Sequence, residues 1–151
     1  MSQMTTTTSL KKPSSGRKRA TARASNGARS AHELVSVVHA GLLFRELEIL
    51  REQLALPMDQ LASKLGIARA TLHRRKVSGR LGADESDKVL RFARLLAQAT
   101  DVFGGVEEAR QWLSFPQYGL GGAVPLDFAG TEVGAREVEK LLGRIEYGVY
   151  S

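Results

Sequence analysis

The chain has 151 residues, 42% of them apolar and 25% charged, which is enough for one modest domain or for two small ones that share a core. It has no cysteine, so a disulfide framework, thiolate metal sites and a thiol nucleophile are excluded, and a reducing cytoplasm is the expected location. The net charge of +6 is concentrated in residues 1–32, with seven basic and no acidic side chains, and in residues 64–94, with nine basic and three acidic, a distribution typical of proteins that bind nucleic acid.

Residues 1–32 are expected to form a disordered basic arm. Four threonines at 5–8 and the sequence PSSG at 13–16 leave few apolar side chains, too few to offset the entropy cost of ordering the segment. The arm either attracts DNA without sequence preference or only keeps the chain solvated, and both interpretations remain open. An acid-free segment rich in Arg, Ser and Thr also has the composition of an organellar transit peptide.

From Glu33 onward the apolar residues recur about every 3.6 positions without a credible alternating strand, which predicts an all-α fold. The longest apolar run in the N-terminal half, residues 40–44, is far shorter than the ~20 residues that span a bilayer. The first amphipathic helix ends near Pro57, because proline disfavours helix at the residue before it. Its apolar stripe consists of Leu42, Leu43, Leu47, Leu50 and Leu54.

Five or more helices are predicted after this first one. Two short helices, over 58–65 and about 69–77, are followed by a turn over 78–82 and by a longer helix that starts near Asp84 and ends before Gly104. In the longer helix the stripe is predicted to be Val89, Phe92, Ala93, Leu96, Ala97 and Phe103, with Lys88, Arg91 and Arg94 on the other side. Further helices are predicted over 106–113, 125–129 and 132–147.

Residues 58–77 have the pattern of a helix-turn-helix. Ala62 is small where the two helices must cross closely, and Gly66 lies where the turn favours a left-handed backbone. Leu61, Leu65, Ile67 and Leu72 supply the shared core. The exposed side of the second helix then suits the DNA major groove, because Arg binds guanine and Thr meets a base edge or a methyl group. The predicted DNA-binding residues are Arg69, Ala70, Thr71, His73, Arg74 and Lys76.

One position departs from the helix-turn-helix pattern. Arg75 falls where the second helix normally turns an apolar residue inward. Either the helix is rotated or Arg75 pairs with an acid, so the sequence leaves open which of Arg74 and Arg75 faces DNA. The alternative for the whole stretch is a helical hairpin with a solvated basic face and no DNA bound.

The remaining polar and aromatic residues give weaker signals. The glycines around Leu120 predict a compact turn rather than a phosphate-binding loop. Trp112 is interpreted as a core residue, although together with Leu113, Phe115 and Tyr118 it suggests a binding patch. His32, His39 and His73 lack the spacing of metal ligands, and adjacent Glu107 and Glu108 suit the first turn of a helix better than acid/base catalysis.

Several segments in the C-terminal half, taken in order, resemble the Xre/MbcA/ParS-type antitoxins with a toxin-binding C-terminal domain. They are TLHRRK at 71–76, DESD at 84–87, ARQWL at 109–113, LGGAVPL at 120–126, GAREVE at 134–139 and LGRIEYGVY at 142–150. The resemblance covers about residues 45–151. The turn with LGG and PL and the terminal GRIE segment are its specific motifs.

The resemblance implies a type II toxin–antitoxin system in a bacterial cytoplasm. Such antitoxins bind a RES-domain toxin that depletes NAD, mask its active site, dimerise, and repress their own operon by binding operator DNA. They are not enzymes, so we expect no catalytic residue, cofactor or metal. The implied organisation is an arm over 1–32, a helix-turn-helix and dimerisation region over 33–100, and a helical toxin-binding domain over 101–151.

The end of the chain is the predicted toxin contact, because a short amphipathic tail with tyrosines suits a partner's cleft. The residues assigned to it are Arg144, Glu146, Tyr147, Val149, Tyr150 and Ser151. A frayed end is the competing interpretation, and Arg144 and Glu146 equally suit an ordinary surface salt bridge. The rival function is a plain helix-turn-helix repressor whose C-terminal half only dimerises or senses a small ligand.

Overall fold

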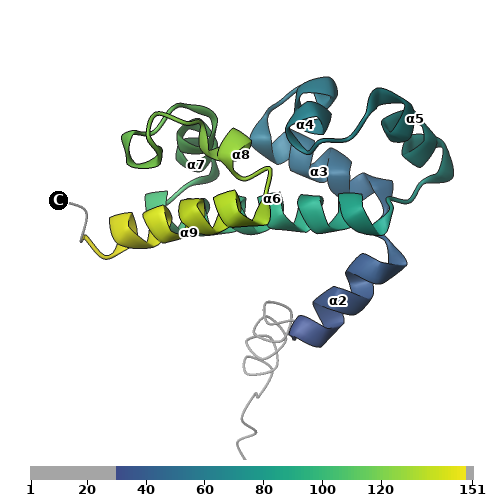
Figure 1. Cartoon of the computed structure of the whole chain (residues 1–151), viewed down its shortest axis with the longest axis horizontal. Coiled ribbons are helices and arrows are strands. Elements are labelled where there is room, and N and C mark those ends of the chain that lie inside the picture. Colours follow the sequence, from purple (N-terminus) through teal and green to yellow (C-terminus); the bar gives the residue numbers. More distant parts are fainter. Residues whose placement is uncertain (1–29, 149–151) are drawn as a thin grey trace, which may run out of the picture. The chain divides into compact units, whose positions relative to one another are not determined.

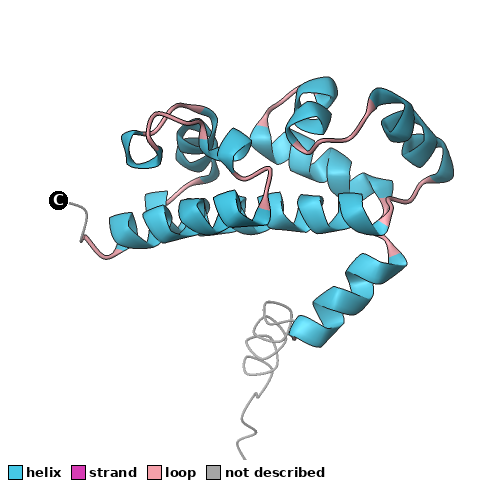
Figure 2. Ribbon diagram, viewed as in Figure 1, coloured by secondary structure: helices cyan, strands magenta, loops and turns pink. Residues whose placement is uncertain are grey.

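The computed structural model of the chain describes residues 30–148. The arm predicted over 1–32 therefore lies outside the described residues except for its last three positions. Helices joined by loops make up the described part, which contains two isolated β-bridges and no extended strand (Figure 2). The all-α prediction is confirmed.

In chain order the helices are α2 (Ala31–Ala40), α3 (Phe44–Leu54), α4 (Met58–Lys64), α5 (Arg69–Ser78), α6 (Ala83–Phe103), α7 (Val106–Ser114), the 3-10 helix η1 (Tyr118–Leu120), α8 (Pro125–Phe128) and α9 (Glu132–Glu146) (Figure 1). Helices α3 to α9 lie close to their predicted positions, whereas α2 was not predicted, and its first two residues, Ala31 and His32, belong to the arm that was expected to be disordered. Residues 36–148 belong to one compact unit, and α2, which begins before it, is described by itself. None of the helices described is long and apolar enough to cross a membrane.

The start of α3 differs from the prediction. Leu43, expected in the apolar stripe, is 50% exposed because it precedes the helix in an extended conformation and bridges to Arg80. The stripe proper begins at Phe44 and continues through the buried Leu47 and Leu50. Because α3 starts at Phe44, one residue after Leu43, this leucine lies at the surface and not in the core.

The two helices of the helix-turn-helix are α4 and α5. Gly66 has φ +72, the left-handed conformation predicted for the turn, and the amide of Ile67 donates to the carbonyl of Ala62 at 2.8 Å. Leu61 and Leu65 are buried beneath this turn, as predicted. The sequence pattern thus identified both the motif and its small core.

The long helix α6 contacts α3, α7 and α9. Because neighbours cover it from more than one direction, its buried arc is wider than a single stripe and includes Leu95 and Ala99. The prediction that Arg91 lies on the solvent side was wrong, since that side chain is only 9% exposed. Its guanidinium donates to Asp87 Oδ2 at 2.9 Å, to Glu132 Oε2 at 3.2 Å and to the carbonyl of Gly130 at 3.3 Å.

The C-terminal helices pack on the second half of α6. Trp112 is half-buried with its ring 5.5 Å from that of Phe103, centroid to centroid, which confirms its interpretation as a structural residue. The glycine-rich turn is also confirmed: Gln117 and Ala123 form an antiparallel bridge that closes it around η1. Pro125 opens α8 at its first helical position.

The helix-turn-helix and the C-terminal helices share α6, which runs without a break through residue 100, the predicted limit between them. Two further links join them. Lys64 Nζ at the end of α4 lies 2.6 Å from Asp127 Oδ1 on α8, and Gln98 Nε2 on α6 donates to the carbonyl of Glu139 at 3.2 Å. The domain limits stay a prediction, but the two regions are in direct polar contact.

Candidate functional site

Two backbone hydrogen bonds and one from a backbone amide to a side chain fix the C-terminal end of α5. The amide of Phe44 donates to the carbonyl of Gly79 at 2.9 Å, and that of Leu81 donates to the carbonyl of Leu42 at 2.8 Å. The amide of Leu42 in turn donates to Oγ of Ser86, a completely buried hydroxyl. The start of α3 and the loop between α5 and α6 are thereby joined, and α5 projects from this junction.

Arg75 pairs with an acid, which resolves the departure from the helix-turn-helix pattern. Its Nε donates to Glu85 Oε1 at 2.6 Å, and the amide of Gly82 donates to the same oxygen at 3.0 Å. Burial by itself would raise the pKa of Glu85, but the hydrogen bonds from Gly82 and Arg75 hold this pKa below its usual value. Arg75 is thus engaged with α6, and Arg74 is the arginine on the free side of α5.

We expect the substitution Glu85→Gln to lower the free energy of unfolding by about 1 kcal/mol at pH 7. Because the pKa of Glu85 is lower in the folded protein than in the unfolded chain, its contribution is complete above pH 4.5 and is lost as the pH falls through the folded value. Thermal unfolding of the wild-type protein and of Glu85→Gln from pH 7 to pH 3 measures how the stability difference between them depends on pH. Their midpoints should converge at the acid end, and a constant difference across the range would contradict the assignment.

The structure places five of the six predicted DNA-binding residues on the exposed surface of α5. These are Arg69, Ala70, His73, Arg74 and Lys76. Thr71 is half-buried, and its hydroxyl accepts a hydrogen bond from Arg74 Nη2 at 3.2 Å. Among the described residues no carboxylate oxygen lies within 4.0 Å of the charged nitrogens of Arg69, Arg74 or Lys76. These three side chains therefore keep their charge available for phosphates or base edges.

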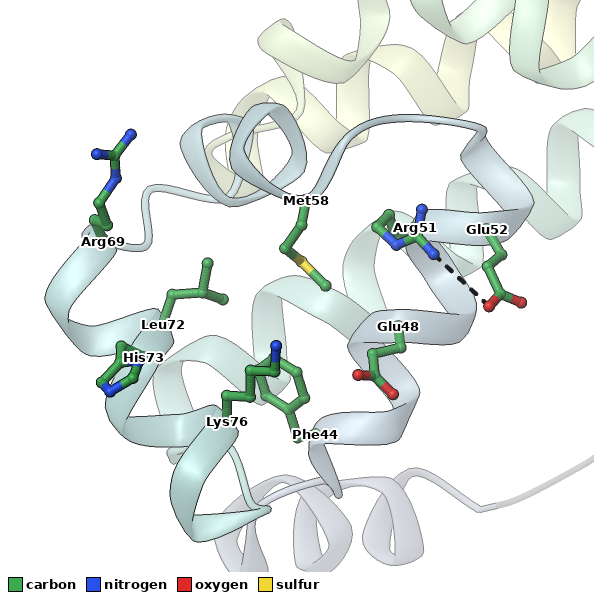
Figure 3. Close-up of a pocket in the computed structure, with 9 residues that line it drawn as sticks. All are labelled: Phe44, Glu48, Arg51, Glu52, Met58, Arg69, Leu72, His73 and Lys76. Carbon is green, nitrogen blue, oxygen red and sulfur yellow. Dashed lines mark ion pairs between the residues drawn. The ribbon is translucent and has the colours of Figure 1, made fainter.

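The exposed residues divide between two sides of α5. Arg69, His73 and Lys76 recur at helical spacing and line a cavity of about 530 Å³ between α5 and α3 (Figure 3). Phe44, Met58 and Leu72 supply its apolar lining, and Glu48, Arg51 and Glu52 lie on the α3 side. Ala70 and Arg74 do not line this cavity. The six predicted residues therefore do not form one uniform face.

The predicted toxin-contact residues are only partly described. Arg144, Glu146 and Tyr147 are exposed on the last turn and cap of α9, while Val149, Tyr150 and Ser151 lie outside the described residues. Within residues 30–148 neither Arg144 nor Glu146 takes part in an ion pair. The alternative of a surface salt bridge therefore finds no support in this part of the chain.

A second exposed feature lies in the loop between α7 and α8. Phe115 is 62% exposed and Tyr118 is 94% exposed, and the loop that carries them is held by the amide of Gln117. This side-chain nitrogen donates to the carbonyls of Trp112, at 2.8 Å, and Phe115, at 3.2 Å. The sequence suggested a binding patch of aromatic residues here, and the structure separates its members: Phe115 and Tyr118 are exposed, whereas Trp112, three residues before Phe115, is packed against the core.

Among the described residues no group of three or more His, Cys, Asp or Glu side chains is placed to hold a metal ion. His73 lies on the exposed side of α5 instead, and its neighbours there are cationic.

Comparison with known protein families gives two matches, one to each region of the fold and one after the other along the chain. Residues 33–94 match the antitoxin Xre-like helix-turn-helix domain, and residues 98–148 match the antitoxin Xre/MbcA/ParS C-terminal toxin-binding domain. A protein named Antitoxin Xre from Yersinia enterocolitica is 35% identical over 120 residues, which cover 78% of this chain and 81% of that protein. The chain belongs to the Xre antitoxin family.

Two other members of the Xre antitoxin family match over shorter stretches. Antitoxin Xre of Photorhabdus laumondii is 43% identical over 74 residues, covering 48% of this chain and 50% of the relative. Antitoxin Xre of Pseudomonas putida is 38% identical over 68 residues, which cover 45% of this chain and 43% of that protein. The family resemblance predicted from the sequence motifs is confirmed, and the matched segments meet within α6.

Proposed function

We propose that this chain is the antitoxin of a type II toxin–antitoxin system, which binds a RES-domain toxin, masks its NAD-depleting active site and represses its own operon. The observation that carries the proposal is the succession of an Xre-like helix-turn-helix and a toxin-binding domain in one chain. In this role the protein acts by binding alone and needs no catalytic residue or cofactor. The expected location is the bacterial cytoplasm, at the operator when DNA is bound.

On the toxin side, the proposal assigns masking to the end of α9 and the residues beyond it. Arg144, Glu146 and Tyr147 are exposed and free of ion pairs to described residues, so they remain available to a partner. The tail formed by Val149, Tyr150 and Ser151 would enter the toxin's cleft. A RES-type toxin is the expected partner because the turn with LGG and PL and the GRIE segment resemble antitoxins of such toxins.

On the DNA side, the proposal assigns operator binding to α5. Its exposed cations lie on a helix whose C-terminal end is anchored by backbone hydrogen bonds, so their positions are set before DNA binds. A homodimer is part of the proposal, because helix-turn-helix proteins read two half-sites about one helical turn apart. One copy of α5 would then enter each half-site.

The proposal is tested by co-expressing the tagged chain with the protein encoded by the neighbouring gene. Stoichiometric co-purification, together with growth arrest when this chain is withheld, is the expected result. Absence of both would favour the rival function, a plain repressor with a C-terminal dimerisation or sensing region. Because a RES-type toxin depletes NAD, the cellular NAD level during the arrest tests the toxin class separately: a normal level would exclude that class but keep the antitoxin role.

Arg74→Ala is expected to weaken operator binding about tenfold, since a side chain that contacts a base or phosphate contributes ~1–3 kcal/mol. The thermal midpoint and toxin neutralisation should stay unchanged, because Arg74 bonds only to the Thr71 hydroxyl among the described residues. Arg94→Ala is the matched control: it removes the same charge from an exposed site on α6, where Arg94 pairs with Glu139 at 3.5 Å. An equal loss of operator affinity in both variants would mean that only net charge matters.

A further inference from the structure

Two glycines lie inside α9, and the fold needs only one of them. A Cβ at Gly134 would overlap the carbonyl oxygen of Phe128, so packing of α8 against α9 requires a glycine there. A Cβ at Gly143 would meet nothing within 4 Å. Glycine destabilises a helix interior relative to alanine, and nothing in the described chain offsets that cost at position 143. Among the described residues, therefore, the packing gives no reason for a glycine at position 143.

Gly143 lies on the side of α9 that faces away from the core. The buried residues of the helix, such as Val138 and Leu142, form one stripe, and Gly143 is rotated off it. One helical turn further on, at i+4, is Tyr147, which is 79% exposed. The helix therefore presents backbone without a side chain one turn before a large exposed aromatic ring, an arrangement that lets a partner approach the helix backbone closely.

The loop around η1 adds two more aromatic side chains near the same helix. This loop contacts α9 and lies with the last turns of α9 at one end of the described fold (Figure 1). Phe115 and Tyr118 point into solvent although Gln117 and the closing bridge hold their backbone in place. Exposed aromatic residues on a backbone that is already ordered lose little entropy on binding, and such residues dominate protein interfaces.

We propose that the toxin docks over a surface formed by Gly143 and Tyr147 on α9 and by Phe115 and Tyr118 on the η1 loop. This inference rests on the proposed function and extends the contact well beyond the tail. The fitting partner surface is largely apolar, with a side chain or backbone segment that packs against the bare backbone at Gly143 and acceptors for the two tyrosine hydroxyls. The surface lies wholly within the segment that matches the toxin-binding domain, which favours the toxin over a second copy of this chain.

The decisive variant is Gly143→Ala in the full chain. Its thermal midpoint should rise, because alanine favours the helix and meets no neighbour, while its affinity for the purified toxin from the neighbouring gene should fall about tenfold. A merely structural glycine cannot give this combination. Val133→Ala is the matched control: it also raises helix propensity in α9 and changes a residue that is 75% exposed at the other end of the helix. It should leave the affinity unchanged.

A second variant, Phe115→Ser with Tyr118→Ser, tests the loop, and it too should bind the toxin about tenfold more weakly with unchanged helical content. Wild-type affinity in this variant and in Gly143→Ala would overturn the inference and leave the proposed function intact. If Gly143→Ala instead converts dimers to monomers in sedimentation without weakening toxin binding, the surface belongs to a second copy and the inference is wrong. If the wild-type chain binds no toxin, the proposed function fails and the inference fails with it.

Discussion

Gly134→Ala is expected to lower the free energy of unfolding by about 2 kcal/mol, which for a domain of this size shifts the thermal midpoint by about 8 °C. The added methyl group overlaps a backbone carbonyl, that of Phe128, which cannot rotate away as a side chain would. Either α8 or the start of α9 must move. The expected loss already allows for the ~1 kcal/mol that alanine gains over glycine inside a helix.

Thermal unfolding of Gly134→Ala beside Gly143→Ala gives a comparison within one helix. The two substitutions are chemically identical, so any difference in the sign of their effect reports the surroundings of each glycine. A stabilised Gly134→Ala protein would show that α8 does not pack against α9 as described.

Removal of residues 149–151 is expected to abolish toxin neutralisation, with growth arrest returning in cells that express both proteins. The reason is that residues entering a partner's cleft contribute a disproportionate share of the binding free energy. Helical content and operator binding should be unchanged, because α9 ends at Glu146 and the predicted DNA contacts lie on α5. Circular dichroism and an operator-binding assay on the same preparation serve as internal controls.

Full protection by the truncated chain would contradict the role of the tail in masking. Protection with weakened toxin affinity would place more of the contact on the surface around Gly143 and the η1 loop. A truncated chain that also loses operator affinity would report a general folding defect, and its circular dichroism spectrum would show it.

The helices from α3 onward could be predicted from sequence because local signals coincide with the apolar period. Pro57 ends the first predicted helix and directly precedes α4, Gly104 follows the last residue of α6, and Pro125 begins α8. The segment predicted over 58–65 ends one residue earlier in the structure, and the segment over 69–77 ends one residue later. Such agreement is expected where stop signals flank short amphipathic helices.

The errors arose where tertiary contacts decide. Arg91 has the sequence position of a solvated arginine, yet Glu132, 41 residues away, and the carbonyl of Gly130 give its buried guanidinium partners that periodicity cannot reveal. The opposite error concerned Leu43, whose exposure depends on where α3 starts. The pairing of Arg75 with Glu85 also required the fold, because the sequence left open whether the helix is rotated or Arg75 pairs with an acid.

The candidate surfaces were predicted unevenly. The sequence identified the second helix of the helix-turn-helix as the basic element, and the structure then separated Arg75, which binds Glu85, from the exposed Arg74. It did not identify Gly143, since a glycine with empty space beside it and one packed against a carbonyl look the same in a sequence.

The unbroken α6 limits how such a protein can evolve new partners. Its residues serve the cores of both the DNA-binding and the C-terminal regions, so a C-terminal region acquired by recombination must present the same packing to Leu95 and Ala99 or the recipient's core is lost. Exposed side chains that do not pack in that core, such as Tyr118, can be substituted without disturbing it. Divergence of toxin recognition is therefore expected to proceed by point substitution on the outer surface, with the shared helix inherited as one piece.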